Sequence, residues 1–291
     1  MEIFNSVKDM QNKANLLRQQ GQKIAFVPTM GYFHEGHLDL MREGRKRGDY
    51  LVVSIYVNPT QFAPTEDLGK YPRNFERDRD MADQVGVDGI FFPDNAGMYP
   101  PHYQTYVDVE GVTKNLCGAS RAGHFRGVAT VCAKLFNIVK PHVTIFGKKD
   151  FQQLVTIKTM LRDLNMDIEV IGMPTTREHD GLAMSSRNVY LSEEERKSAL
   201  CLSRSLALAK RLFEAGETDA VKVLDQVGKY IESHPYTAID YVKISYVDSI
   251  EETNVVGNDT FIAMAVKVGK TRLIDNYVFG EDLNIQYSEE R

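Results

Sequence analysis

The sequence predicts an α/β protein, with a doubly wound parallel sheet followed by a smaller α+β domain of helices and a three-stranded antiparallel sheet. Three observations support this prediction. Short apolar segments alternate with helical segments over residues 24–171, and near residue 180 the pattern changes to helices followed by three strand-like segments. The segment 50–57 is almost uniformly apolar, which is typical of a parallel strand covered by helices on both faces.

The first part of the chain reads as repeated βα units. A helix is expected from the capping sequence Ser6–Asp9 to Gly21, because a serine followed by an acid three residues later favours a helix start and glycine a helix end. Strands are expected at 24–27, 50–57, 89–92, 143–146 and 168–171, with helices at 38–47, 74–85, 128–139 and 151–164. Such units join parallel strands by right-handed crossovers.

The second part begins with another capping box, Ser192–Glu195, which predicts the start of a long helix. A second helix is expected over 219–233, followed by strands at 239–247, 260–268 and 272–278, with a tight hairpin turn between the last two. We therefore expect two domains, residues 1–178 and 179–291, joined within residues 175–188.

Composition restricts the class of protein. The chain has 291 residues, 43% of them apolar, and a net charge of −5, which is ordinary for a globular protein and disfavours a nucleic-acid-binding face. Its three cysteines are far apart, so we expect buried thiols and no disulfide framework. No signal-peptide pattern and no span-length apolar run occur, which predicts a cytoplasmic protein with no membrane partner.

The stretch 28–37, Pro-Thr-Met-Gly-Tyr-Phe-His-Glu-Gly-His, lies between a predicted strand and a predicted helix. His34 and His37 would share one face of the first helical turn, where backbone N–H groups and the helix dipole favour an anion such as phosphate. The pair could also be an ordinary polar face. A zinc site is less favoured, because the spacing is not H-E-x-x-H and no third ligand lies nearby.

Two common nucleotide-binding loops are absent from the sequence. No G-x-G-x-x-G follows the first strand, and Gly269-Lys-Thr271 lacks the earlier glycine of a P-loop because Met264 occupies that position. A phosphate-binding protein without either loop needs another device, which the two histidines could supply.

Of three further polar clusters, two directly follow predicted strands and the third lies at the expected domain junction. The amides of Asn58 and Gln61 could orient a polyol or a carboxylate, and Lys149 could contact phosphate oxygens. Ser185-Ser-Arg187 could grip a triphosphate. Considered one at a time, these clusters could be surface turns or a solvated helix start. Parallel strands, however, place their carboxyl ends at one edge of the sheet, where ligands bind, so the common position of the clusters favours a binding site.

Taken together, the motifs resemble the pantoate–β-alanine ligase family. The resemblance runs in order over about residues 24–190, through motifs at 28–37, 57–62, 71–73, 147–154 and 184–188. It implies a Rossmann-like nucleotidyltransferase domain with a HIGH-type H-x-x-H, a KMSKS-like loop at 184–187, a C-terminal lid and a homodimer. The implied reaction joins (R)-pantoate to β-alanine through a pantoyl-adenylate, converting ATP to AMP and pyrophosphate with Mg²⁺.

The resemblance also implies roles for individual residues. The catalytic residues would be His34, His37 and Lys149. ATP would be bound by Met30, His34, His37, Gly147, Lys149, Asp150, Thr176, Met184, Ser185, Ser186 and Arg187. Pantoate would be held by Gln61, Gln153 and Asn58. Asp78 would be a metal ligand, although the charge-alternating segment 76–80 otherwise predicts that Asp78 and Asp80 are solvated.

The chain departs from the family pattern at two positions. Lys148 stands where members commonly have an acid, and Arg77 stands where some have a second aspartate. His124, near Arg121 and Arg126, is interpreted as part of a surface patch.

Two other functions remain as alternatives. An AMP transferase acting on a phosphate acceptor is disfavoured by the uncharged amides of Gln61 and Gln153. A noncatalytic nucleotide- or RNA-binding module is disfavoured by the acidic net charge.

Overall fold

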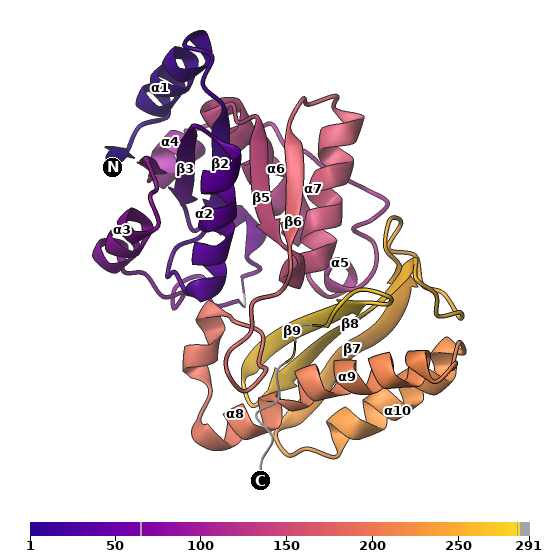
Figure 1. Cartoon of the computed structure of the whole chain (residues 1–291). Coiled ribbons are helices and arrows are strands. Elements are labelled where there is room, and N and C mark those ends of the chain that lie inside the picture. The colour runs from indigo at the N-terminus through magenta and orange to yellow at the C-terminus, as the bar shows by residue number, and fades with distance from the viewer. Residues whose placement is uncertain (65, 284, 286–291) are drawn as a thin grey trace. The chain divides into compact units, whose positions relative to one another are not determined.

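The computed structural model describes residues 1–64, 66–283 and 285 (Figure 1). The chain forms two compact units that interleave along the sequence. The N-terminal unit comprises residues 1–109, 121–148 and 156–173, and the C-terminal unit comprises 110–120, 149–155 and the residues from 174 onward. The expected boundary after residue 178 stays a prediction.

The N-terminal unit contains a six-stranded, wholly parallel sheet in the order β1-β4-β3-β2-β5-β6. The predicted fold class is confirmed. Its strands are β1 (Glu2–Phe4), β2 (Ile24–Thr29), β3 (Tyr50–Ile55), β4 (Gly89–Phe91), β5 (Val143–Gly147) and β6 (Glu169–Met173). Strand β1 was not predicted, because three residues, two of them exposed, carry no readable periodicity.

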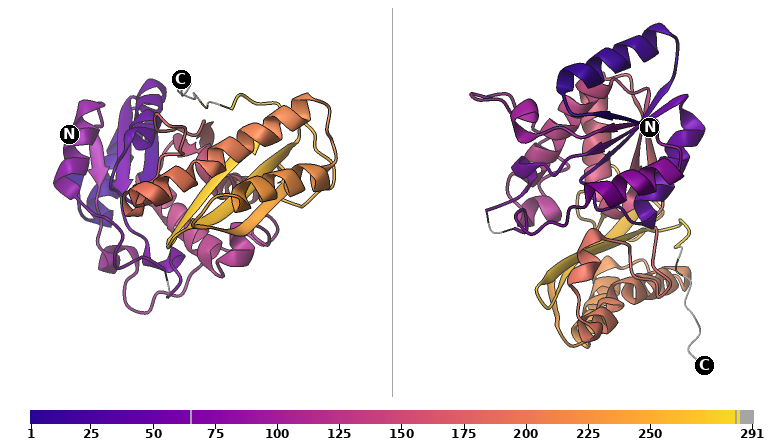
Figure 2. Two further views of the ribbon diagram at one scale, coloured as in Figure 1. Left: turned by 90° about the horizontal axis from the view of Figure 1, so that it is seen from below. Right: turned by 90° about the vertical axis from the view of Figure 1, so that its left-hand side faces the viewer.

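Helices cover both faces of this sheet (Figure 2). The helices of the unit are α1 (Val7–Gln19), α2 (Glu35–Arg47), α3 (Phe75–Gln84), α4 (Asn95–Met98), α6 (His124–Val139) and most of α7 (Phe151–Asp163). On one face, Leu38 and Met41 of α2 pack with Val27 and Val53 of the central strands. On the other face, Phe26 meets Phe136 of α6 edge to face, with ring centroids 6.3 Å apart.

Helix α6 begins four residues before the predicted start at residue 128. Gly123 supplies its N-cap in a left-handed conformation, with φ of +79°. Residues 124–127 extend the helix over a stretch in which polar residues and a glycine obscure the helical period. The early start places His124 and Gly127 on a helix rather than in a loop.

The C-terminal unit contains the predicted three-stranded antiparallel sheet. Its strands are β7 (Thr237–Tyr246), β8 (Thr260–Val268) and β9 (Thr271–Val278). The predicted tight turn joins β8 to β9, and Gly269 adopts φ of +58° there. Glycine accepts a positive φ at little cost, which fits its position in a two-residue hairpin turn.

Helices α8 (Glu193–Ala199), α9 (Cys201–Glu214) and α10 (Ala220–Glu232) belong to the same unit, and α9 and α10 lie along one face of the sheet (Figure 1). Leu202 and Leu206 of α9 pack with Val223 and Val227 of α10 against apolar residues of β8. The long helix predicted after Ser192 is in fact two helices that meet at Leu200.

The opposite face of this sheet is covered by two short segments from earlier in the chain. Residues 110–120 include α5 (Cys117–Ser120), and residues 149–155 include the first turn of α7. The ring of Phe151 lies 4.5 Å from that of Phe261 on β8, and the Cys117 Sγ lies 3.1 Å from the Tyr241 hydroxyl on β7. Apolar and polar contacts thus cover this face of the sheet with residues of the same unit that precede the sheet in sequence.

A buried ion pair holds the start of the longest segment of the C-terminal unit, which begins at residue 174. The guanidinium of Arg177 donates to the Asp275 carboxylate on β9 at 2.6 and 3.1 Å, and their side chains are only 6% and 1% exposed. Arg177 lies in a hairpin in which the Met184 N–H donates to the Thr176 carbonyl at 3.0 Å. The pair therefore ties the hairpin 176–184 to the edge strand of the sheet.

All three cysteines are buried and free, as expected. Within the part of the chain that the structure describes, no helix combines the length and the apolar character needed to cross a membrane.

We predict that Asp275→Ala will lower the free energy of unfolding by about 3–5 kcal/mol, because the Arg177 charge would stay buried without its partner. Denaturant unfolding followed by circular dichroism measures this change. Asp225→Ala is the matched control, since it removes an ion pair with Lys229 on the exposed face of α10 and should change stability little. Equal stability of the two variants would contradict the prediction.

Candidate functional site

The two histidines of the stretch 28–37 lie together at the start of α2. His34 is the N-cap of the helix and His37 lies in its first turn. Their ring centroids are 4.1 Å apart, and the His34 N–H donates to His37 Nδ1 at 3.3 Å. Because Nδ1 accepts, a neutral His37 carries its proton on Nε2 and can donate it to another group. The predicted common face is therefore present.

The turn that precedes His34 is held by Asp78 of α3. The N–H groups of Tyr32 and Phe33 donate to its carboxylate at 2.6 and 2.7 Å. Asp78 is 1% exposed, so the expectation that it is solvated is wrong, whereas Asp80 is exposed as expected. Burial raises the pKa of Asp78, and the two backbone donors oppose that shift. These two N–H groups are thus bonded to the protein rather than offered to a ligand.

The motif after β3 brings three predicted binding residues together. The single-turn 3-10 helix Pro59–Gln61 follows Asn58, which is 1% exposed. The Asn58 amide donates to Gln61 Oε1 at 3.0 Å and to the Gly127 carbonyl at 3.1 Å, and Gln61 Nε2 lies 3.2 Å from the Met30 sulfur. Asn58 thus orients Gln61, whose own Nε2 donor faces the Met30 sulfur, a weak acceptor.

The backbone of Gln61 is held by residues interpreted from the sequence as a surface patch. The Gln61 carbonyl accepts from His124 Nδ1 at 2.8 Å and from Arg121 at 3.4 Å, and Arg121 pairs with Glu66 at 2.6 Å. Arg121 and His124 are half-buried, so the interpretation is wrong for them; Arg126 is exposed and lies over the Tyr106 ring. The contacts join residues about sixty positions apart, which no local pattern could reveal.

Lys149 lies in a 3-10 turn, Lys148–Asp150, that leads into α7. Its carbonyl accepts from the Asn276 side chain on β9 at 2.8 Å, and Asn276 is buried. Lys149 and Gln153 are half-buried and lie one helical turn apart, and Asp150 is exposed. Gly147 ends β5 in the N-terminal unit, with open space where a Cβ would lie.

Gln152, between these residues, is buried and anchors them to the segment 110–120. Its Oε1 accepts from the Cys117 N–H at 3.0 Å, and its Nε2 donates to the carbonyls of Val112 and Asn115 at 2.9 and 2.7 Å. One side chain therefore fixes three backbone groups of a loop about 35 residues earlier. No local pattern in the sequence indicates this role, because glutamine in a helix usually faces solvent.

The segment 184–187 continues from the hairpin of Arg177. Ser185 caps the 3-10 helix Ser186–Tyr190 by accepting from the Arg187 N–H at 3.2 Å. The buried amide of Asn188 donates to Glu178 at 2.6 Å and to the Ala183 carbonyl at 3.1 Å. Ser185 and Arg187 are half-buried, so both are within reach of solvent or a ligand.

The predicted residues fall into two groups, each within one unit. Met30, His34, His37, Asn58, Gln61, Asp78 and Gly147 belong to the N-terminal unit, and Lys149, Asp150, Gln153, Thr176 and residues 184–187 belong to the C-terminal unit. That the two groups share one cavity stays a prediction. Over residues 1–64, 66–283 and 285, no three His, Cys, Asp or Glu side chains gather as a metal site.

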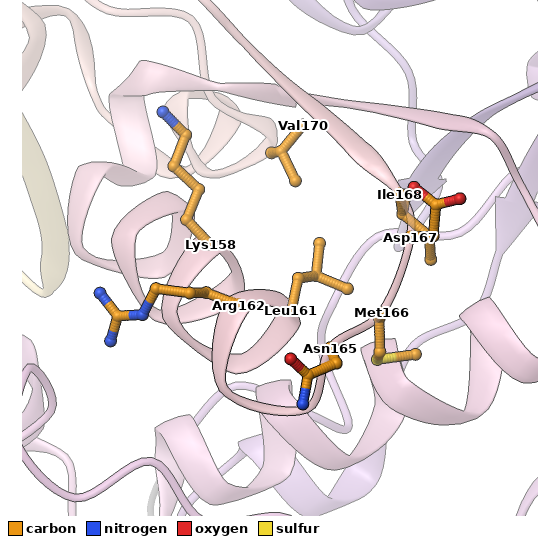
Figure 3. Close-up of a pocket in the computed structure, with 8 residues that line it drawn as sticks. All are labelled: Lys158, Leu161, Arg162, Asn165, Met166, Asp167, Ile168 and Val170. Carbon is orange, nitrogen blue, oxygen red and sulfur yellow. The ribbon is translucent and has the colours of Figure 1, made fainter.

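A pocket of about 570 Å³ lies elsewhere, at the C-terminal half of α7 and the start of β6 (Figure 3). It is lined by the polar or charged residues Lys158, Arg162, Asn165 and Asp167 and by the apolar residues Leu161, Met166, Ile168 and Val170. It contains none of the predicted site residues, so we assign it no role in the site.

The chain is similar to known proteins over nearly its whole length. The sequence model of the family described as pantoate-beta-alanine ligase matches residues 2–278. The pantothenate synthetase of Syntrophus aciditrophicus (strain SB) is 68% identical over 286 residues, covering 98% of this chain and 100% of the relative. That of Geobacter sulfurreducens is 56% identical over 282 residues, covering 97% of this chain and 100% of the relative.

Two solved structures are also similar. The pantothenate synthetase from Thermus thermophilus has 40% identity and a TM-score of 0.90, covering 96% of this chain and 99% of its own. The pantoate-beta-alanine ligase from Francisella tularensis, solved with beta-gamma ATP and beta-alanine, has 30% identity and a TM-score of 0.78, covering 98% of this chain and 100% of its own.

We predict that Gln152→Ala will release the loop 112–117, because it leaves three backbone groups without their buried partner, at a cost of about 1–3 kcal/mol. Hydrogen–deuterium exchange of peptides spanning 110–120 should accelerate by about tenfold or more, since about 1.4 kcal/mol corresponds to a factor of ten. Gln226→Ala, on the exposed face of α10, is the control. Unchanged exchange in the Gln152 variant would show that the loop is held by other contacts.

Proposed function

The chain belongs to the pantoate–β-alanine ligase family, and we propose how its residues carry out the reaction of that family. The enzyme joins (R)-pantoate to β-alanine and converts ATP to AMP and pyrophosphate through a pantoyl-adenylate. The observation that carries this conclusion is the family match from residue 2 to residue 278. The assignments to individual residues that follow are our proposal.

The first step forms the pantoyl-adenylate. A carboxylate oxygen of pantoate attacks the α-phosphorus of ATP, the new O–P bond forms, and the bond to the pyrophosphate oxygen breaks. Negative charge builds up on the phosphate oxygens and on the leaving pyrophosphate. We assign the stabilisation of this charge to His34, His37 and Lys149, with Arg187 on the triphosphate. The Nε2–H of His37 and the start of α2 support this assignment, because both favour an anion.

The remaining ATP contacts are assigned to Met30, Gly147, Asp150, Thr176, Met184, Ser185 and Ser186. The open space at Gly147 would allow a ribose to approach the backbone closely. The exposed carboxylate of Asp150 could accept hydrogen bonds from ribose hydroxyls. The pairing of Thr176 with Met184 across a hairpin supports a common role for the two residues.

Pantoate is assigned to Gln61 and Gln153, with Asn58 as a third residue. Among the described residues, the partner of Gln61 Nε2 is the Met30 sulfur, a weak acceptor, so a hydroxyl or carboxylate oxygen of pantoate would be a better one. The Asn58 amide already donates to Gln61 and to the Gly127 carbonyl. We therefore propose that Asn58 acts mainly by orienting Gln61.

In the second step the amine of β-alanine attacks the acyl carbon of the mixed anhydride. The C–N bond forms, the C–O bond breaks so that AMP leaves with its electron pair, and the amine nitrogen gives up a proton to solvent. These two reaction steps need no covalent enzyme intermediate. Burial raises the pKa of Cys132 and of Cys201 to about 12, which disfavours a thiolate nucleophile at either position.

Mg²⁺ is implied by the resemblance, and when bound it would neutralise phosphate charge. The residues described do not fit a protein-built site for it: no three His, Cys, Asp or Glu side chains gather among them as a metal site, and both Asp78 oxygens accept backbone N–H groups. We therefore propose that any Mg²⁺ reaches the protein with ATP and largely keeps its waters.

We further propose that the protein is a cytoplasmic homodimer. Its three free, buried thiols suit a reducing compartment. The dimer follows from the family resemblance, and sedimentation of the purified protein tests it.

The products of the reaction test the function. Purified protein should release AMP and pyrophosphate when pantoate and ATP are supplied, and should form pantothenate only when β-alanine is added. ADP and phosphate as products would rule out the ligase. Transfer of AMP to a phosphorylated acceptor, with no need for an amine, would favour the alternative transferase.

We predict that Lys149→Ala will retain its fold and will slow adenylate formation by about 10²–10³-fold, the usual cost of losing one donor to developing charge. Pyrophosphate release in the presence of pantoate measures the rate. Lys148→Ala is the matched control, because it removes the same charge one residue earlier and should have little effect. Equal rates in the two variants would remove Lys149 from the proposed machinery.

A further inference from the structure

We propose that Asp78 is a positioning residue and not a metal ligand. Its buried carboxylate acts as an anion within the protein that binds the N–H groups of the turn before His34 and so holds that turn in place. The proposal rests on the assignment of His34 and His37 to adenylate formation. Three features support it: the backbone of the turn, the space around the carboxylate, and the neighbouring Arg77.

The turn has an unusual backbone. Gly31 and Tyr32 have φ of +83° and +53°, so two successive residues are left-handed. For Tyr32 this conformation costs about 1–2 kcal/mol, because its Cβ crowds the backbone. Successive N–H groups in such turns converge and form a concave anion site. Here the anion is the Asp78 carboxylate, which accepts from Tyr32 and Phe33 at 2.6 and 2.7 Å.

The Asp78 carboxylate is closely packed against the backbone of the turn at Gly31, and the Ile55 side chain lies close to the same glycine. A Cβ added at Gly31 would lie 3.0 Å from Asp78 Oδ2 and 2.9 Å from the Ile55 side chain. Asp78 is 1% exposed. A hydrated Mg²⁺ would therefore have to displace both backbone donors and enter a packed region, which opposes metal binding at this carboxylate.

Arg77 supports the same turn from its outer side. Its guanidinium carbon lies 5.1 Å from the centre of the Tyr32 ring, and its Nη1 lies 3.6 Å from Asp78 Oδ1. The side chain is 42% exposed, so its charge is screened and it contributes modestly. Arg77 thus contacts both the strained residue and the anion that stabilises it.

The position of the histidines depends on this turn. Phe33, whose N–H is bonded to Asp78, is followed directly by His34, and the His34 N–H is bonded to His37. If the turn relaxed, both imidazoles would move away from their position relative to the helix start. A misplacement of about 1 Å can cost about 10²-fold in rate.

The test compares Asp78→Asn with Asp80→Asn, an exposed position on the same helix. We expect Asp78→Asn to lower kcat for adenylate formation by about 10–10²-fold, while the Mg²⁺ concentration for half-maximal rate is unchanged. Asp80→Asn should leave both unchanged. Recovery of the Asp78→Asn rate at high Mg²⁺ would identify a metal ligand instead, and an unaltered kcat would exclude both roles.

A second variant separates positioning from a loss of folding. Tyr32→Asn should partly restore kcat when combined with Asp78→Asn, because asparagine tolerates the left-handed conformation better than tyrosine. Arg77→Ala, at an exposed position, should fold and reduce kcat a few-fold with the same Mg²⁺ dependence. Absence of any effect in Arg77→Ala together with no rescue by Tyr32→Asn would overturn the proposal. Activity of the unaltered protein tests the ligase function separately.

Discussion

A polar side chain that is buried must find hydrogen-bond partners, and this requirement holds the loops of the candidate site in place. Asn58, Asp78, Gln152 and Asn276 are all nearly inaccessible to solvent, and each bonds to the backbone of a segment far away in sequence, which for Asn58 is the first turn of α6. Removing such a side chain leaves buried backbone groups without partners, which costs more than the bond itself contributes. The loops can therefore carry side chains that are exposed to a ligand without being free to move.

The same requirement separates the residues that contact a ligand from the residues that position them. Gln61, Lys149 and Arg187 are half-buried and can reach solvent. Their neighbours in sequence or in space, such as Asn58 for Gln61 and Asn276 for Lys149, are buried and use their hydrogen-bonding groups within the protein. A short segment such as 149–153 thus contains both residues that can contact a ligand and residues that position them, because successive helical residues point in different directions.

The periodic features of the fold could be predicted from the sequence, and the contacts between distant segments could not. The buried parallel strands, the antiparallel sheet and the turn at Gly269 follow from local apolar patterns and turn chemistry, and the proximity of His34 and His37 follows from helical spacing. From the sequence, Asp78 is expected to be solvated and His124 to lie in a surface patch, and no role is assigned to Gln152. Their partners lie 45, 63 and 35 positions away, so only the folded chain shows that they are engaged. Strand β1 escaped prediction because it is too short to show a period.

The sheet of β7, β8 and β9 has one face that is covered by residues 110–120 and 149–155, which precede it in the chain. This arrangement limits how such a protein could evolve by exchange of gene segments. A segment that encodes only the residues after 178 would bring the sheet into a new host without the side chains that shield Phe261 and Tyr241. The segment after residue 178 is therefore not expected to fold in a new host by itself. It would have to be transferred together with residues 110–120 and 149–155.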